Sequence, residues 1–266
     1  MSQHSMVKIG LTGASGRMGQ MITEVISQSD DLQLAYATDH AKSPVIGAAV
    51  AGFPDVEITT NIADLAANSQ VIIDFTRPEA TIQHVEAARK AGTPIVVGTT
   101  GLSAEDEAVL HAAAKDIPVV YCANTSVGVT LLGQVVEAVA RQLGTDWDIE
   151  IVETHHNQKI DAPSGTALAL GHAAARGRNV ALDDVRDSGR DGITEIRKPG
   201  DIGFAVMRGG DVAGEHSVIF YGQQERVEIT HRATSRIIFA RGALRAARFA
   251  VQQKAGLYDM QQVLDG

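Results

Sequence analysis

The sequence has 266 residues, 44% of them hydrophobic but only 4% aromatic, and its formal net charge is -9. This size and apolar content exclude a disordered chain and allow one large domain or two smaller ones with a core of aliphatic side chains. A nucleic-acid partner is not expected, because the acidic chain would repel a phosphate backbone.

Cysteine content and the N-terminal residues bear on the compartment. Cys122 is the single cysteine, which excludes a disulfide framework or a thiolate metal site within the chain and fits a reducing cytosol. The stretch Met1–Met6 is polar and lacks the apolar run of a signal peptide, and no segment approaches the length of a membrane span. We therefore expect a cytoplasmic protein with no membrane partner.

The first half of the chain alternates apolar strand-like runs with amphipathic helical runs. Gly92 follows one helix as a C-terminal signal, and Ser103 with Asp106 is close to a capping box at the start of the next. Strands are expected at Val7–Gly13, Leu32–Asp39, Val71–Thr76, Pro94–Thr99 and Val119–Ala123, and helices at Met18–Gln28, Glu79–Ala91 and Ser103–Lys115. This alternation predicts an α/β fold with a doubly wound parallel sheet.

A glycine-rich turn joins the first strand to the first helix. Its residues are Gly13, Ala14, Ser15, Gly16, Arg17, Met18 and Gly19. The spacing G-x-x-G-x-x-G is a variant of the dinucleotide fingerprint, in which Gly13 and Gly16 permit a tight turn near a pyrophosphate and Gly19 permits the helix to pack on the sheet. Amide groups at the helix start would bind the anion without a basic surface. A purely structural glycine turn is the alternative.

Asp39 favours the cofactor interpretation of this turn. It lies twenty residues after Gly19, where an acidic residue would bind the adenosine ribose hydroxyls. Its carboxylate would repel a 2′-phosphate, so NADH is favoured over NADPH. His40 and Arg17 are candidate partners for such a phosphate, and the choice between the two nucleotides therefore stays open.

The pattern changes after Asn124, where strand-like runs follow one another closely. Helices are expected at Val127–Leu143, Ser164–Arg176 and Ser235–Lys254, and strands at Ile149–Thr154, Gly203–Met207, Ser217–Tyr221 and Arg226–Thr230. Such spacing predicts a second, α+β domain with a mixed sheet at residues 127–235, and a first domain at residues 1–126 that the C-terminal helix 236–266 completes. The charged segment Arg178–Asp201 has no assigned element, and its basic side chains are expected to be solvated.

A polar segment between a strand and a helix holds the strongest candidates for chemistry. His155 titrates near neutral pH and can exchange protons, and Lys159 can pair with a carboxylate or donate a proton. Ser164 is a candidate N-cap, after which Gly165 and Thr166 would offer first-turn amides to a carboxylate. The alternative is that the histidines are surface residues and that the Pro-Ser-Gly sequence is only a helix start.

A metal site is not expected in this segment. His155 and His156 are consecutive strand residues and would point to opposite faces of a sheet. The segment also has no clustered Cys or Glu residues to complete a coordination shell.

Seven segments, in order along nearly the whole chain, carry a more specific pattern. They are GASGRMG near the N-terminus, DFTRPE (Asp74–Glu79), VGTTG (Val97–Gly101), ANTSVGV (Ala123–Val129), ETHHNQKIDAPSGTAL (Glu153–Leu168), GFAVMRGGDVAGEHSV (Gly203–Val218) and EITHRATSR (Glu228–Arg236). Together they resemble the dihydrodipicolinate reductase family. The resemblance implies a Rossmann-type first domain, a second domain that binds substrate and assembles a homotetramer, and NAD(P)H-dependent reduction of a cyclic imine dicarboxylate in lysine and diaminopimelate biosynthesis.

The resemblance also implies roles for single residues. His155 would act as proton donor or acceptor and Lys159 as proton donor, and the substrate would be held by His156, Gly165 and Thr166. The dinucleotide would be bound by Gly13, Ala14, Ser15, Gly16, Arg17, Met18, Asp39, His40, Arg77, Gly98, Thr99, Thr100, Ala123, Asn124, Thr125 and Ser126. Two positions depart from the family. His40 stands where an Arg is frequent, which weakens the case for NADPH, and Thr125 stands where some members carry an aromatic residue.

Two rival functions share part of this pattern. A non-catalytic dinucleotide-binding sensor would need the glycine turn but not His155, Lys159 or the turn before the second-domain helix. Another two-domain dehydrogenase, acting on an amino acid such as aspartate, would share the fold and differ in substrate.

Overall fold

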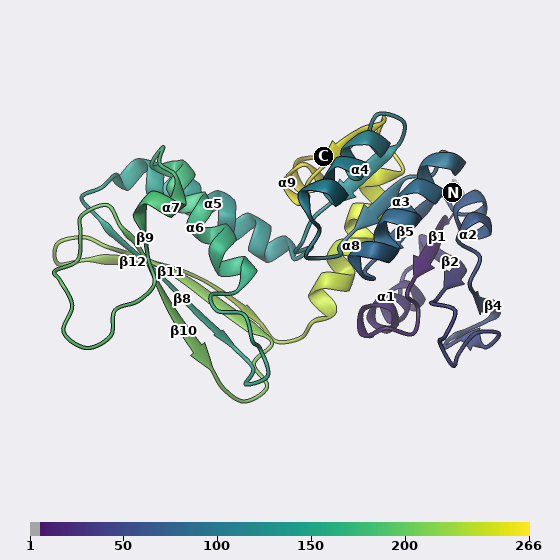
Figure 1. The fold of residues 1–266 in the computed structure, drawn as a ribbon, viewed down its shortest axis with the longest axis horizontal. Helices are drawn as coiled ribbons and strands as arrows, with labels where there is room; N and C mark the ends of the chain where they lie inside the picture. The colour runs from purple at the N-terminus through teal and green to yellow at the C-terminus, as the bar shows by residue number, and fades with distance from the viewer. Residues whose placement is uncertain (1–5) are drawn as a thin grey trace. The chain divides into compact units, whose positions relative to one another are not determined.

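The computed structural model describes residues 6–266, which form two compact units (Figure 1). Unit 1 consists of the chain up to Ser126 together with Ile237–Gly266, and unit 2 consists of Val127–Arg236. The expectation about the stretch Met1–Met6 falls, for its first five residues, outside the described residues.

Unit 1 is built on an eight-stranded sheet with the order β13-β7-β6-β5-β1-β2-β4-β3. The strands are β1 (Val7–Thr12), β2 (Leu32–Thr38), β3 (Ala49–Val50), β4 (Phe53–Thr59), β5 (Val71–Asp74), β6 (Ile95–Val97), β7 (Pro118–Tyr121) and β13 (Gly256–Tyr258). Every neighbouring pair is parallel except β3–β4, which is antiparallel at the sheet edge. The predicted α/β fold with a largely parallel sheet is confirmed.

Helices cover both faces of this sheet (Figure 1). They are α1 (Arg17–Ser27), α2 (Ile62–Asn68), α3 (Pro78–Ala91), α4 (Ala104–Ala113), α8 (Ile237–Ala250) and α9 (Met260–Asp265). The central strand β5 is wholly buried, as expected for a parallel strand covered on both sides. The predicted helix ends are also confirmed, because Gly92 closes α3 with a φ of 73° and Ser103 and Asp106 form a capping box at the start of α4.

Several short elements of unit 1 escaped prediction. Strand β4 carries Pro54 and Asp55 and has no clear apolar alternation, and α2 has only seven residues. The last predicted helix is too long, because α8 ends at Ala250 and is followed by β13 and α9. A capping box between Asp259 and Gln262 begins α9 and was the local signal available for it.

Unit 2 contains a five-stranded mixed sheet with the order β12-β11-β8-β10-β9. The strands are β8 (Asp148–His155), β9 (Arg186–Asp187), β10 (Ile202–Arg208), β11 (Gly214–Tyr221) and β12 (Arg226–Ala233), and the helices are α5 (Val127–Leu143), α6 (Gly165–Gly177) and α7 (Leu182–Val185). Strand β8 pairs in parallel with β10 and antiparallel with β11. Helices α5 and α6 pack on one face of the sheet, and apolar side chains such as Ile149, Ile151 and Phe220 fill the core there. The predicted mixed sheet is confirmed.

The charged segment Arg178–Asp201 is more ordered than the sequence predicted. It contains α7 and β9, and Arg197 is only 16% exposed because it pairs with Asp148 at 2.7 Å and with Glu150 at 3.0 Å on β8. The expectation of solvated basic side chains is therefore wrong for Arg197.

Candidate active site

The residues predicted to bind a dinucleotide gather where parallel strands of unit 1 end. Strand β1 lies between β5 and β2, so the chain adds strands first on the β2 side of β1 and later on its β5 side. In doubly wound sheets, ligands bind where the strand order reverses in this way. The predicted positions lie within a few residues of strand ends: Gly13, Asp39 and Gly98 directly follow β1, β2 and β6, while Ala123 and Arg77 lie two and three residues after β7 and β5.

The glycine turn after β1 is fixed by close backbone contacts. Gly13 has a φ of 64°, a left-handed conformation that favours glycine. A Cβ atom on Gly19 would lie 2.3 Å from the carbonyl oxygen of Gly13 and 2.7 Å from that of Ala14. The carbonyls that a side chain would meet belong to the turn at the end of β1, so Gly19 lets α1 begin close against that turn.

Three amides of the turn already have partners within the protein. The Ala14 amide donates to the Thr38 carbonyl at 3.1 Å, the Gly16 amide to the Gly13 carbonyl at 3.0 Å, and the Ser15 amide to Asp39 Oδ2 at 2.8 Å. Gly16 is the N-cap of α1 and makes no side-chain bond to the first-turn amides. The amides at the start of α1, those of Arg17 and Met18, are therefore the ones positioned for an anion.

Asp39 is bound onto the glycine turn. Its side chain is 5% exposed, and Oδ1 accepts the His40 amide at 2.8 Å while Oδ2 accepts that of Ser15. Burial alone would raise the pKa of Asp39, but these hydrogen bonds lower it overall. A negative charge therefore stands beside the turn, and the 70%-exposed His40 is the nearest basic side chain paired with it.

A buried carboxylate supports the turn from below. Asp74, at the end of β5, is fully buried and accepts hydrogen bonds from Thr12 Oγ1 at 3.1 Å, from the Thr76 amide at 2.9 Å and from His84 Nδ1 at 3.2 Å. Burial would raise the pKa of Asp74, and its hydrogen bonds, that of His84 first, lower it overall. The methyl group of Thr76 would lie 2.9 Å from a Cβ on Gly13, so Asp74 helps to hold the wall of the turn.

The other predicted cofactor residues have mixed surroundings. Gly98 faces the ring of Phe75, and Thr99 is buried and accepts a hydrogen bond from Thr81 Oγ1 at 2.8 Å. Thr125 donates from Oγ1 to the Phe239 carbonyl at 2.7 Å and so anchors the start of α8. Arg77 and Thr100 are exposed.

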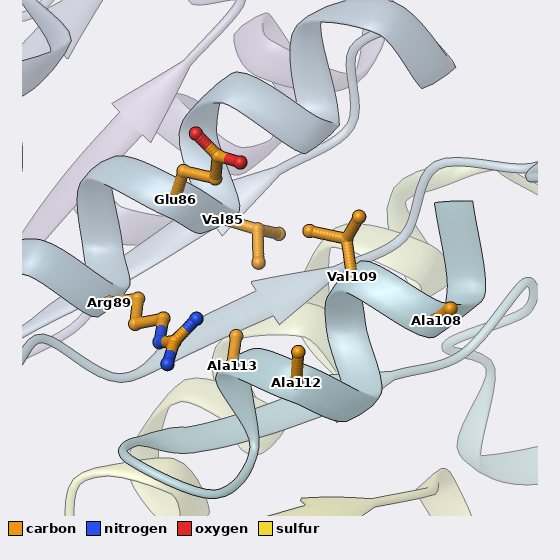
Figure 2. A pocket seen from close by; sticks show the side chains of 7 residues that line it. All are labelled: Val85, Glu86, Arg89, Ala108, Val109, Ala112 and Ala113. Carbon is orange, nitrogen blue, oxygen red and sulfur yellow. The ribbon is translucent and has the colours of Figure 1, made fainter. Parts of the chain in front are cut away.

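One open pocket in unit 1 lies away from these residues, between α3 and α4 (Figure 2). It is lined by Val85, Glu86, Arg89, Ala108, Val109, Ala112 and Ala113. None of these residues is a predicted site residue, so the pocket is not part of the candidate active site.

The second group of predicted residues lies in unit 2, around the end of β8. Alternate residues of β8 are buried, namely Ile149, Ile151, Glu153 and His155, so a carboxylate and an imidazole continue an apolar row toward the helices. His155 Nδ1 lies 2.5 Å from Glu153 Oε2. Burial lowers the pKa of His155, and the carboxylate opposes that shift only in part. His155 is thus neutral near pH 7, with Nδ1–H donated to Glu153 and the Nε2 lone pair available.

Lys159 and the start of α6 follow in the next turn. Lys159 Nζ lies 2.8 Å from both carboxylate oxygens of Asp161. Ser164 caps α6 by accepting the Ala167 amide, which confirms the predicted N-cap. A Cβ on Gly165 would meet open space, so the first turn of α6 can be approached closely by a ligand.

His156 and His216 complete the surroundings of this site. His156 Nε2 lies 3.0 Å from Arg236 Nη2 and must accept the hydrogen bond, because a guanidinium only donates. His216 Nε2 lies 3.1 Å from Ser164 Oγ, and its ring meets that of His155 edge-on at 5.1 Å. Burial lowers the pKa of His216 to about 4, so it is neutral. Sequence reasoning missed Glu153, Arg236 and His216 as parts of the site.

Residues 6–266 contain neither a metal-binding cluster nor a membrane-spanning helix. No group of three or more His, Cys, Asp or Glu residues in this part of the chain is arranged to hold a metal ion. Nor is any helix of this range long and apolar enough to cross a bilayer.

The fold and the site define an enzyme of the two-domain NAD(P)-dependent oxidoreductases. The chain matches the models of the N-terminus of dihydrodipicolinate reductase over residues 7–125 and of its C-terminus over residues 128–264, and it belongs to this family.

Curated relatives match over nearly their full length. The 4-hydroxy-tetrahydrodipicolinate reductase of Burkholderia multivorans is 48% identical over 97% of this chain and 99% of the relative, and that of Dechloromonas aromatica is 48% identical over 98% of both. A solved dipicolinate-bound dihydrodipicolinate reductase from a Paenisporosarcina species has the same fold, with a TM-score of 0.79, 22% identity, and coverage of 97% of this chain and 99% of that one.

Proposed function

We propose that this chain reduces 4-hydroxy-tetrahydrodipicolinate to tetrahydrodipicolinate with NAD(P)H, as an enzyme of lysine and diaminopimelate biosynthesis. The reaction consumes one hydride and one proton and releases the 4-hydroxyl group as water. The observation that carries the proposal is the arrangement at the end of β8, where one segment supplies a neutral imidazole, an ammonium and a helix start. A protein that only senses a dinucleotide would not need this combination of an imidazole, an ammonium and a helix start.

The glycine turn of unit 1 fits the pyrophosphate of the nucleotide. A Cβ on Gly13 or Gly19 would come within 3.0 Å of another atom, so the backbone of the turn is closely packed, and the N-terminus of α1 supplies amides and a favourable dipole. When bound, the nicotinamide supplies the hydride, while the protein orients both reactants. The remaining cofactor residues proposed from the sequence, from Asp39 to Ser126, follow the ends of β2, β5, β6 and β7, strands of the same sheet.

NADH is the preferred nucleotide in this proposal. The anionic carboxylate of Asp39 is fixed next to the turn by the amides of Ser15 and His40. A ribose hydroxyl can donate to such a carboxylate, whereas a 2′-phosphate would be repelled by it. His40 lacks the permanent charge and the planar fork of donors of an Arg, so it offsets this repulsion less than an Arg would.

The start of α6 and the turn before it would hold the dicarboxylate. First-turn amides of Gly165 and Thr166 would bind one carboxylate, as helix N-termini do. Asp161 holds Lys159 Nζ through two oxygens, and the third N–H of the ammonium can turn to the substrate. His156, fixed by Arg236, would contribute to substrate binding with Nδ1–H as donor.

His155 would manage the proton of the reaction. The hydride arrives at a ring carbon made electrophilic by conjugation with the imine, and charge develops on the ring nitrogen or the adjacent carbon. The Nε2 atom of His155 can accept or return a proton there, since Nδ1 stays bonded to Glu153. Lys159 would act as the second proton donor beside it.

The uncovered face of the unit 2 sheet supports assembly as a homotetramer. Helices α5 and α6 cover one face, while Met207 and Tyr221 are exposed on strands of the sheet. An exposed apolar sheet surface of this kind is typical of a subunit interface. Light scattering of the purified protein measures its oligomeric state directly. We also infer that the enzyme acts in the cytoplasm.

A coupled assay tests the activity. The condensation product of pyruvate and aspartate semialdehyde is offered with NADH or NADPH, and the fall in absorbance of the reduced nucleotide is followed. We expect turnover with both nucleotides and a lower KM for NADH, because Asp39 favours an unphosphorylated ribose. Turnover of free amino acids such as aspartate, with none of the condensation product, would refute the proposed function.

A further inference from the structure

A nearly buried ion pair lies behind His155. Arg208, the last residue of β10, contacts Glu153 on β8 through two parallel bonds, Nη1 to Oε2 at 2.8 Å and Nη2 to Oε1 at 2.9 Å. The Glu153 side chain is 1% exposed and that of Arg208 is 20% exposed. A bidentate guanidinium–carboxylate pair fixes the orientation of both groups, which a single hydrogen bond does not.

The guanidinium also binds the segment that carries Lys159. Arg208 Nε donates to the Lys159 carbonyl at 3.3 Å, and Nη2 donates to the Asp161 carbonyl at 2.6 Å. Asp161 in turn holds the Lys159 ammonium. Arg208 therefore fixes the backbone of Lys159 directly. It also fixes the backbone of Asp161, whose carboxylate holds the Lys159 ammonium.

The carboxylate of the same pair binds the other two parts of the site. Glu153 Oε2 lies 2.5 Å from His155 Nδ1, and Oε1 accepts the Ser164 amide at 2.9 Å, next to the start of α6. Burial would raise the pKa of Glu153, but hydrogen bonds from Arg208, His155 and Ser164 lower it overall, so the carboxylate is ionised. All hydrogen bonds to it are thus donated by its neighbours.

We propose that Arg208 and Glu153 are positioning residues for the reduction, and that their ion pair sets the mutual placement of the His155 imidazole, the Lys159 segment and the start of α6. This inference rests on the proposed function, in which those three parts act on one substrate. The pair itself touches no reacting atom. Its effect is to fix Nδ1–H of His155 as the donor to Glu153 and to keep Nε2 for the substrate.

The charges around His155 come from four directions. Glu153 lies on the same strand, Arg208 on β10, His216 on β11, and Lys159 in the turn after β8. Glu153 raises the pKa of His155, whereas Lys159 and Arg208 lower it and His216 is neutral. Replacing Glu153 by a neutral side chain therefore lowers the pKa of His155.

The substitution Arg208→Lys tests the geometric part. Lysine keeps the positive charge but cannot form the bidentate pair and also hold two carbonyls. We expect kcat to fall by about 100-fold, the effect of displacing catalytic groups by roughly 1 Å, with unchanged nucleotide affinity. The control is Arg248→Lys, which alters a bidentate pair with Asp31 (2.6 and 2.7 Å) in unit 1, and it should retain wild-type kcat.

The substitution Glu153→Gln tests the electrostatic part. We expect the pH-profile limb that reports His155 to move to lower pH by about one unit, and the His155 imidazole to titrate lower by the same amount in NMR spectra. Glu153→Asp, which keeps the charge, should recover part of the shift. Either a wild-type kcat in Arg208→Lys or an unmoved His155 titration in Glu153→Gln overturns the inference.

These outcomes separate the inference from the function on which it rests. Wild-type protein that turns over the condensation product, with Arg208→Lys equally active, contradicts the positioning role alone. Wild-type protein without turnover contradicts the proposed function. The NMR titration needs no substrate, so it tests the ion pair in either case, and it also reports directly whether each variant is folded.

Discussion

Replacing His155 by alanine is expected to abolish most turnover while leaving nucleotide binding intact. The imidazole is the group whose Nε2 can exchange a proton with the substrate, since Nδ1 is bonded to Glu153. General acid–base catalysis by a positioned side chain contributes about 10²- to 10⁴-fold, so kcat should fall by that factor. Steady-state kinetics gives kcat, and fluorescence titration with NADH gives the dissociation constant of the nucleotide.

The exposed His172 on α6 provides the matched control. His172→Ala removes an imidazole from the same unit without touching the site, and it should keep wild-type kcat. Equal kcat in the His155 and His172 variants would contradict the role of His155. A loss of NADH binding in His155→Ala would contradict the assignment of the nucleotide to unit 1.

The second large effect is expected from Gly19→Ala. Its new methyl group would lie 2.3 Å from the Gly13 carbonyl oxygen and 2.7 Å from that of Ala14, and neither backbone group can move without distorting the turn. Overpacking of this kind costs about 1–3 kcal/mol in the free energy of unfolding. Because the displaced turn presents the amides of α1, we also expect the affinity for NADH to fall about tenfold or more.

A glycine in open space is the control for this substitution. A Cβ on Gly133, in α5, meets no atom within 4 Å, so Gly133→Ala should leave NADH affinity unchanged and raise the free energy of unfolding by about 0.5–1 kcal/mol. Denaturant unfolding and NADH titration measure both quantities. If Gly19→Ala binds NADH as tightly as the wild type, the turn is not the nucleotide site.

Local sequence signals predicted much of the fold. Gly92, the Ser103 capping box and the Ser164 N-cap marked helix ends that the structure confirms, because each signal acts within a few residues. The edge hairpin β3–β4 and the late β13 were not predictable in this way. Strand β3 has only two residues and pairs with β4 across a register irregularity, whereas β13 has three residues and pairs with β7, which lies far away along the chain.

The support of the candidate site was harder to predict than its reactive groups. Arg208 lies 55 residues after Glu153, and the two meet only because β10 pairs in parallel beside β8. The alternation of β8 did carry a usable signal, since Glu153 falls on the same face as Ile149 and Ile151. A carboxylate at such an inward position needs a buried partner, and the sequence does not say which basic residue supplies it.

The most direct test of the account is a crystal structure with NADH and pyridine-2,6-dicarboxylate, a flat ring with the same two carboxylates as the substrate. We predict the pyrophosphate at the start of α1, beside Gly13 and Gly16, and one carboxylate on the amides of Gly165 and Thr166. Electron density that places either ligand away from these two helix starts would contradict the account.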